Sequence, residues 1–267
     1  MGDFIGGFKT RRLGAFTVLL VSQPPTLVLI GAVVVVRGVP FSPGPWILAG
    51  VLAGVLAGLV GLVGLAAIYR GMAIGVVSVV STIAATGPVI PVLVGVLTGE
   101  RPTALQFSGI ALALGGIALL AFDRRPADGG RRLIPGVTLA LLAALAFGVF
   151  LVAIRYASRP DPLWGVLATR TGSVLALLVL GLAFRSRIKV ARADLRALFA
   201  VGVLDVGADV FFAIATTFGL LSIVSILSPL YPVATVLLSR IVLDERMARP
   251  QQAGIVLALA GVLLITV

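Results

Sequence analysis

Three charged side chains stand inside stretches of the sequence that are otherwise apolar. Arg170 lies in an apolar run near 162–184. Asp205 and Asp209 lie in the next run, near 197–218, and residues four apart share one face of an α-helix. A central Arg or Asp costs about 2.5 to 3.5 kcal/mol on membrane-insertion scales, so such groups face a cavity or a partner. An Arg–Asp pair between neighbouring helices would lower that cost, and either carboxylate could take up a proton.

A purely structural ion pair is the alternative explanation for these charges, as is a group close enough to the membrane surface to reach water. Both alternatives stay open at the level of sequence. In the first half of the chain, Gln23 occupies the position that matches Arg170, and the run from 46 to 69 contains no acid. Chemistry that depends on charge is therefore expected in one half only, with Asp209 as the proton-linked carboxylate and Asp205 beside it.

The chain consists of two copies of one unit. A shift of 144 residues sets the stretch 75–93 over 219–237, with matching serines and prolines. A shift of 145 residues sets 100–120 over 245–265, with identical residues at ten of 21 positions. These identities include a Glu-Arg pair and a Gln, so apolar composition alone does not explain them.

Both copies carry a Ser-x-x-Ser step followed by prolines, at Ser78 and Ser81 and again at Ser222 and Ser225. Proline removes a backbone donor and clashes with an earlier carbonyl, which kinks a helix and frees a C=O group. Alternatively, the prolines only set helix curvature and the serines bond to their own turn. Together with the charged group, the side chains expected to contact a ligand are Gln23, Ser81, Thr82, Arg170, Asp209, Thr216, Ser225, Ser228 and Tyr231.

Composition places the chain in a membrane. Apolar residues make up 60% of it and charged residues 12%, against about 45 to 50% and about 25% in soluble domains. A nucleic-acid binder would carry its Lys and Arg as a basic stripe, whereas here they form short clusters between apolar runs.

Cys and His are absent, which excludes thiolate or imidazole metal sites and Ser–His–Asp nucleophiles. No P-loop pattern occurs either, so we expect no enzyme, no cofactor and no nucleic-acid partner.

Nine apolar runs are long enough to cross a bilayer as helices, which takes about 20 residues. They lie near 13–36, 46–69, 72–98, 104–122, 133–154, 162–184, 197–218, 219–243 and 250–267. Residues 1–8 match the end of the helix that opens the second half, so we expect a truncated first helix and a ten-helix, all-α polytopic membrane protein. Five helices per repeat force the two copies to enter the membrane in opposite directions, which is a transporter architecture. The expected units are repeat one at 1–123, a linker at 124–132 and repeat two at 133–267.

One motif occurs in both copies. In the first copy it comprises Ser78-Val-Val-Ser81, Pro88, Gly99-Glu100-Arg101-Pro102, Gln106 and Gly109. This motif resembles the second half of an EamA-type repeat of the drug/metabolite transporter superfamily. The resemblance implies two inverted five-helix repeats around a central cavity, movement of small metabolites by alternating access, and an Arg in the seventh helix at the place of Arg170. The Glu-Arg pairs are expected to fix turns between helices.

We therefore expect a multi-pass protein of the plasma membrane that acts as a secondary transporter or exporter of small metabolites or drug-like solutes. Its partners would be the solute, the lipid bilayer and a proton where transport is coupled; a monomer and a homodimer both fit. The alternative is a membrane scaffold or lipid-handling subunit that transports nothing.

Sixteen Lys and Arg lie in odd-numbered connections and four in even-numbered ones, so the positive-inside rule places the C-terminus outside, opposite to the habit of the family.

Further expectations concern packing and the membrane surface. Glycines at every third or fourth position of the run 46–69 allow close helix packing, either inside the monomer or between copies. Tyr69 and Trp164 are expected in the aromatic belt at the membrane surface. Lys9 and Arg155 end their helices, so both are expected to extend toward the interface.

Overall fold

All regular structure in the described part of the chain is helical. The computed structural model describes residues 2–38, 47–120, 136–183 and 190–227, and seven residues between 253 and 264. The helices are α1 Gly2–Leu13, α2 Ala15–Ser22, α3 Pro24–Val36, α4 Ile47–Ile74, α5 Val77–Ala84, α6 Val89–Leu97, α7 Ala104–Leu120, α8 Val137–Ala157, α9 Pro162–Ala183, α10 Arg192–Phe218 and α11 Leu221–Leu227. The expected linker at 124–132 and most of the runs expected at 219–243 and 250–267 lie outside the described residues.

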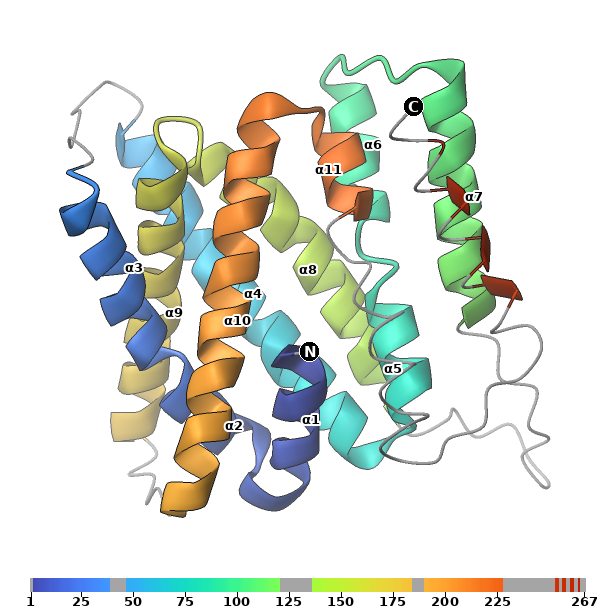
Figure 1. The fold of residues 1–267 in the computed structure, drawn as a ribbon. Coiled ribbons are helices and arrows are strands. Elements are labelled where there is room, and N and C mark those ends of the chain that lie inside the picture. The colour runs from blue at the N-terminus through green and yellow to red at the C-terminus, as the bar shows by residue number, and fades with distance from the viewer. Residues whose placement is uncertain are drawn as a thin grey trace, which may run out of the picture.

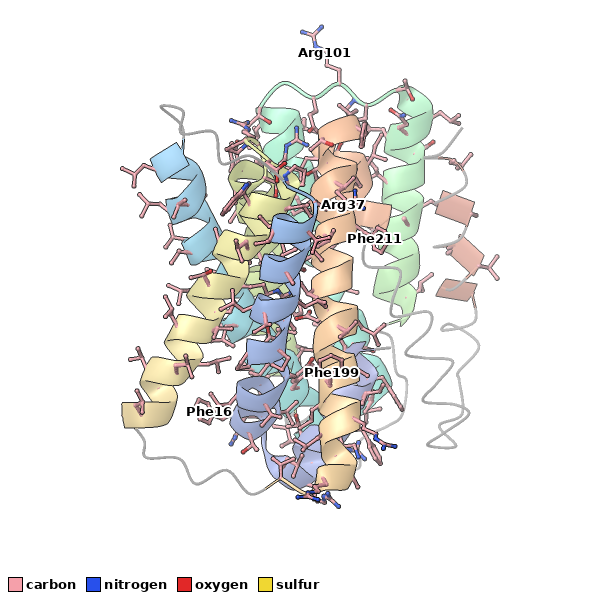
Figure 2. All side chains as sticks on the ribbon, turned by 60° about the vertical axis from the view of Figure 1, so that its left-hand side comes forward. Phe16, Arg37, Arg101, Phe199 and Phe211 are labelled. Atoms are coloured by element: carbon pink, nitrogen blue, oxygen red, sulfur yellow. The ribbon has the colours of Figure 1, made fainter. Side chains whose placement is uncertain are left out.

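Five helical segments in the described part are long and apolar enough to cross a membrane. They are Ala15–Val36, Leu48–Ile74, Val137–Ala157, Pro162–Ala183 and Arg192–Phe218. Their outer faces are apolar as well: Phe199 and Phe211 project away from the bundle on α10 and are 53% and 75% exposed (Figure 2). Lipid contact accounts for such exposure, because the bilayer core is itself apolar. An all-α, multi-pass membrane protein is thereby confirmed, and the count of ten helices stays a prediction.

The two halves of the chain run through the bundle in opposite directions. In Figure 1, α4 descends where α10 ascends, and α3 ascends where α9 descends. Each half packs on the other, since α4 contacts α8 and α9 while α10 contacts α1, α2 and α3. The inverted arrangement is therefore present in the described helices. The middle of the molecule is an interface between the two halves.

The expected span near 13–36 is divided into α2 and α3 at Gln23. Pro24, which follows, has no N–H to donate back into α2. The carbonyl oxygen of Gln23 instead accepts from Thr26, at 3.0 Å from its backbone nitrogen and 2.6 Å from its hydroxyl. The expected span is therefore present with a break that the sequence analysis did not predict, and the Gln23 side chain at this break is fully buried.

The expected span near 72–98 is likewise divided, into α5 and α6, with the break at 85–88. Pro88 cannot donate the bond that would continue α5, so the predicted proline interruption is confirmed in this half. Gly87 lets the break approach α8 closely, because a Cβ there would lie 2.7 Å from the carbonyl oxygen of Ala144. Irregular backbone at membrane depth is thus covered by protein.

The glycines of α4 serve packing inside the molecule. A Cβ at Gly58 would overlap the carbonyl oxygen of Thr169 and lie 2.8 Å from the backbone nitrogen of Ser173 on α9. The Ser173 hydroxyl donates to the Gly58 carbonyl at 2.8 Å across the same contact. A Cβ at Gly61 would lie 2.8 Å from the ring of Phe150 on α8. Close packing within the monomer is therefore confirmed for these glycines.

We predict that Gly58→Ala destabilises the protein, because the added methyl group forces α4 away from α9. Overpacking of this kind costs about 1 to 3 kcal/mol. The matched control is Gly115→Ala on α7, where an added Cβ meets no atom within 4 Å, so the change should stay within about 1 kcal/mol or stabilise the helix. Thermal unfolding of the two purified variants in detergent checks this. Equal unfolding temperatures would contradict the described α4–α9 contact.

Candidate functional site

A buried arginine connects the two halves at the centre of the bundle. Arg170 on α9 is 3% exposed, and its Nη1 atom donates to Gln23 Oε1 at 2.6 Å and to Asp205 Oδ2 at 2.7 Å. Its Nη2 atom donates to Asp209 Oδ2. Gln23 Nε2 also donates to Asp205 Oδ2, at 3.0 Å. The expected Arg–Asp pairing between neighbouring helices is therefore present, and Gln23, which matches Arg170 in the other repeat, belongs to the same network.

Each member of this network is placed by a feature of the sequence already described. The break at Pro24 places Gln23 in the middle of the span, where its amide reaches Arg170 and Asp205. The spacing of four puts both carboxylates, Asp205 and Asp209, on one face of α10. Two ion pairs offset the cost of burying the guanidinium, which is several kcal/mol for an unpaired charge. The Nε atom of Arg170 has no hydrogen-bond partner among the described residues.

A cavity of about 290 Å³ adjoins this network, between the halves. Its walls come from α1, α4, α8, α10 and the α5–α6 break. The lining residues are Gly2, Asp3, Leu65, Ala84, Pro88, Phe147, Phe150, Leu151, Leu204, Asp205, Ala208, Asp209 and Phe212. A smaller space of about 40 Å³ shares five of these residues and adds Gly61, Thr169, Arg170 and Ser173. The charged network thus forms one wall of a site that both repeats enclose.

Two equivalent contacts fix how the repeats correspond. Arg11 donates to the carbonyl oxygen of Met72, and Arg155 donates to that of Thr216, each at 3.5 Å. The same shift of 144 residues relates both members of these pairs. Arg11, and not Lys9, is therefore the counterpart of Arg155 at the end of its helix.

This register shows that the cavity is asymmetric in its chemistry. The shift of 144 residues sets Gly61 of α4 in the place of Asp205, and Leu65 in the place of Asp209. All four residues line one or both of the adjoining spaces. The acids on α10 therefore have apolar counterparts on α4, whereas Asp3 of α1 adds an acid from the first repeat, so charged groups at the cavity are not confined to one half as the sequence predicted.

At one end of the bundle, α1 is tied to α10 by ion pairs. Lys9 Nζ lies 2.9 Å from Asp194 Oδ1, and Arg12 pairs with the other carboxylate oxygen of Asp194. Asp194 is buried by these contacts. Lys9 thus lies at the end of the bundle, where an acid of the opposite repeat pairs with it, and its position relative to the membrane surface stays a prediction.

At the other end, Glu100 ties the first repeat to α11. The backbone nitrogens of Leu221 and Ser222 donate to its carboxylate at 2.7 and 3.0 Å, and the Ser222 hydroxyl donates at 2.8 Å. Arg155 lies 3.6 Å from the same carboxylate. Gly99, with φ of 97°, makes the turn that points Glu100 back at α11. Glu100 therefore joins the two repeats and engages Ser222, while its expected role in fixing its own turn stays a prediction.

The remaining predicted ligand contacts do not gather at this cavity. Ser81 and Ser225 are fully buried and are not among the residues that line it. The hydroxyl of Thr216 donates to the carbonyl oxygen of Ala213 in its own helix, at 2.8 Å. Outside the described part of the chain lie the side chain of Thr82 and all of Ser228 and Tyr231, whose roles stay predictions.

Sequence reasoning missed the aromatic wall and the third acid of the cavity. Phe147 and Phe150 are three apart on α8 and so share a face, and Phe212 faces them from α10. A Phe within an apolar run carries no signal that separates cavity from core or lipid. Asp3 was visible as an acid in the short first helix, and only the packing of α1 against α10 brings it to the cavity.

Tyr69 is a further correction. It was expected in the aromatic belt, yet it is fully buried in the core. Its ring packs against Gly6 of α1, where an added Cβ would overlap it. Its hydroxyl has no hydrogen-bond partner among the described residues. The belt prediction failed because α1 covers a helix end that the hydropathy profile alone leaves at the surface.

Oppositely directed halves, broken helices and a shared central cavity are the architecture of inverted-repeat membrane transporters. The model of the EamA-like transporter family matches residues 8–122 and 134–267. The chain belongs to this family, as a transporter of the drug/metabolite type with two EamA repeats.

Solved structures show the same fold. A crystal structure of a protein matches with a TM-score of 0.73 and 21% sequence identity, covering 99% of this chain and 98% of the other. This likeness concerns the fold alone. No curated protein matches the sequence.

We predict that Arg170→Gln destabilises the protein strongly. The substitution leaves Asp205 and Asp209 buried without their counter-charge, and breaking a buried pair in this way costs about 3 to 5 kcal/mol. Adding Asp209→Asn to Arg170→Gln removes one stranded charge, so the double variant should recover part of the loss. Thermal unfolding in detergent of the single and double variants measures the coupling. A double variant less stable than either single variant would contradict it.

We also predict that Glu100→Gln lowers the unfolding temperature. The amide keeps the shape of the side chain but weakens three bonds from α11 and the pairing with Arg155, and hydrogen bonds to a charged group are worth about 1.5 to 3 kcal/mol. Arg101→Gln, next to it and exposed, is the control and should leave stability unchanged. If the two substitutions act alike, Glu100 does not hold α11.

Proposed function

We propose that this protein is a secondary-active transporter that moves small organic solutes through the cavity between its repeats by alternating access. The observation that supports this most is the cavity of about 290 Å³, because oppositely directed halves both line it and it adjoins a buried charge network. Inverted-repeat transporters place their substrate site at such an interface, near the bilayer midplane. Gln23, Arg170, Asp205 and Asp209 form the polar side of this site.

Alternating access requires the two ends of the bundle to open in turn. At one end, Asp194 holds α1 to α10; at the other, Glu100 holds the first repeat to α11. Each tie joins elements of different repeats, so relative movement of the halves loosens one tie or the other. The breaks at Gln23 and Pro88 are the places where helices can bend without losing an intact ladder of hydrogen bonds.

Proton coupling enters the proposal through Asp209. Protonation of this carboxylate would remove one ion pair from Arg170, while Asp205 keeps its ion pair and Gln23 keeps its hydrogen bond. The guanidinium could then shift without being stranded. Export across the plasma membrane is the direction and location we propose. The competing function is a scaffold or lipid-handling subunit, which needs no cavity that opens to either side.

The absence of Cys from the chain provides a test that needs no known solute. We predict that a single cysteine introduced as Ala208→Cys, on the cavity wall, reacts with a membrane-impermeant maleimide from both sides of the membrane. Right-side-out and inside-out vesicles measure the two sides separately. Phe211→Cys, which faces lipid, is the control and should react from neither side. Reaction of Ala208→Cys from one side only would favour the scaffold.

The same cysteine tests the role of Asp209. In the Ala208→Cys background, we predict that the ratio of labelling from the two sides changes between mildly alkaline and mildly acidic buffer. Asp209→Asn mimics the protonated carboxylate, so it should hold the ratio at its acidic value at every pH. Asp161→Asn is the matched control, because Asp161 caps the start of α9 away from the cavity and Asn preserves such a cap. An unaltered pH response in Asp209→Asn would exclude this role.

A further inference from the structure

We propose that the cavity selects an organic cation with an aromatic or apolar body, and that Asp3 binds its cationic group. This inference rests on the proposed transport function and adds the class of solute. It depends on the balance of charge in the cavity, on the hydrogen bonds that already occupy Arg170, and on the aromatic residues in the cavity lining.

The charge balance of the site is acidic. Asp3, Asp205 and Asp209 line the main cavity, and Arg170 is the one base among the described residues that line the two adjoining spaces. With all four groups ionised, the site carries a formal excess of two negative charges. Inside a low-dielectric bundle such an excess attracts a cation and repels an anion over several ångströms.

Arg170 is not available as an anion receptor. Both of its terminal nitrogens already donate, to Gln23, Asp205 and Asp209. Its remaining Nε atom is buried and has no partner among the described residues, and the smaller space beside it, of about 40 Å³, has room for a water molecule but not for a solute. A solute carboxylate would therefore meet two or three aspartates and no basic group that is free to bind it.

Asp3 differs from the other two acids of the cavity. Asp205 and Asp209 pair with Arg170, whereas no ion pair joins Asp3 to any basic side chain in the described residues. It lies in the first turn of α1 and lines the cavity from the side of the first repeat. A half-buried carboxylate that pairs with no basic side chain of the described residues is costly unless a cation neutralises it. A cationic solute in the cavity would do so.

The aromatic part of the cavity lining suits the rest of such a solute. Phe147, Phe150 and Phe212 line the cavity together with Leu65. Aromatic faces attract cations as well as apolar groups. Leu65 stands where the other repeat has Asp209, so the acidic and apolar walls derive from equivalent positions. A volume of about 290 Å³ lies at the low end of ligand pockets, which fits one ring and a short chain.

A matched set of probes tests the class of solute. The probes are 3-phenylpropylammonium, 3-phenylpropanol and 3-phenylpropanoate, which share a ring and chain and differ in charge. Calorimetric titration of the purified full chain should show the ammonium probe binding at least about tenfold more tightly than the alcohol, with the carboxylate weakest. Comparable or tighter binding of the alcohol or the carboxylate would overturn the inference.

Substitution of Asp3 tests its assignment. In Asp3→Asn, affinity for the ammonium probe should fall about tenfold while affinity for the alcohol stays the same. Asp161→Asn, which also removes one negative charge but lies outside the cavity, should change neither. Loss of both affinities equally, or of neither, would show that Asp3 is not the binding group. Asp3→Glu keeps the charge and should retain the preference for the ammonium probe.

A further test measures how far each probe protects the cysteine of Ala208→Cys against maleimide. All acidic residues are kept in this variant, so the test remains decisive even if Asp3→Asn does not fold. The ammonium probe should slow maleimide labelling of this cysteine more than the alcohol does. The readout also separates the two proposals. Two-sided labelling without a preference for the cation overturns the solute class and leaves transport standing. Selective protection with one-sided labelling supports the solute class and overturns transport.

Discussion

The burial of one guanidinium within an apolar bundle is the constraint on which the rest of the site depends. An unpaired charge there would cost several kcal/mol, so Arg170 must find its acceptors inside the protein. Two come from one face of α10, as Asp205 and Asp209, and a third from the break between α2 and α3, as Gln23. Three helical segments from both repeats therefore converge on one side chain, and this convergence fixes the two halves relative to each other at their centre.

Duplication explains the frame of the molecule but not its chemistry. Equivalent contacts recur at the helix ends of the two repeats. Arg11 donates to the carbonyl of Met72 at the end of α4, and Arg155 donates to that of Thr216 at the end of α10. At the cavity the copies diverge, and Gly61 takes the place of Asp205. A small residue opens space on one side while an acid supplies charge on the other. The inverted frame brings these differing surfaces face to face.

Features that depend on local spacing could be predicted from the sequence, and those that depend on how the halves meet could not. The apolar runs, the proline break and the Arg–Asp pairing follow from composition, missing N–H groups and a spacing of four residues. The burial of Tyr69, the reach of Glu100 to α11 and the position of Asp3 on the cavity all require α1 or α11 to be placed against the other repeat. No periodicity within one helix encodes that placement.

The two aspartates that pair with Arg170 differ in how many hydrogen-bond donors hold each of them. Asp205 accepts from both Arg170 and Gln23, so it is held by two donors and neutralising it would disturb both. Asp209 accepts from Arg170 alone among the hydrogen bonds of the described residues, and it also lines the cavity. When Asp209 is protonated, its carbonyl oxygen is still able to accept from Nη2 of Arg170, while Asp205 keeps its ion pair with Nη1 and Gln23 keeps its hydrogen bond. This difference supports our proposal that Asp209, rather than Asp205, is the acid whose charge changes during transport.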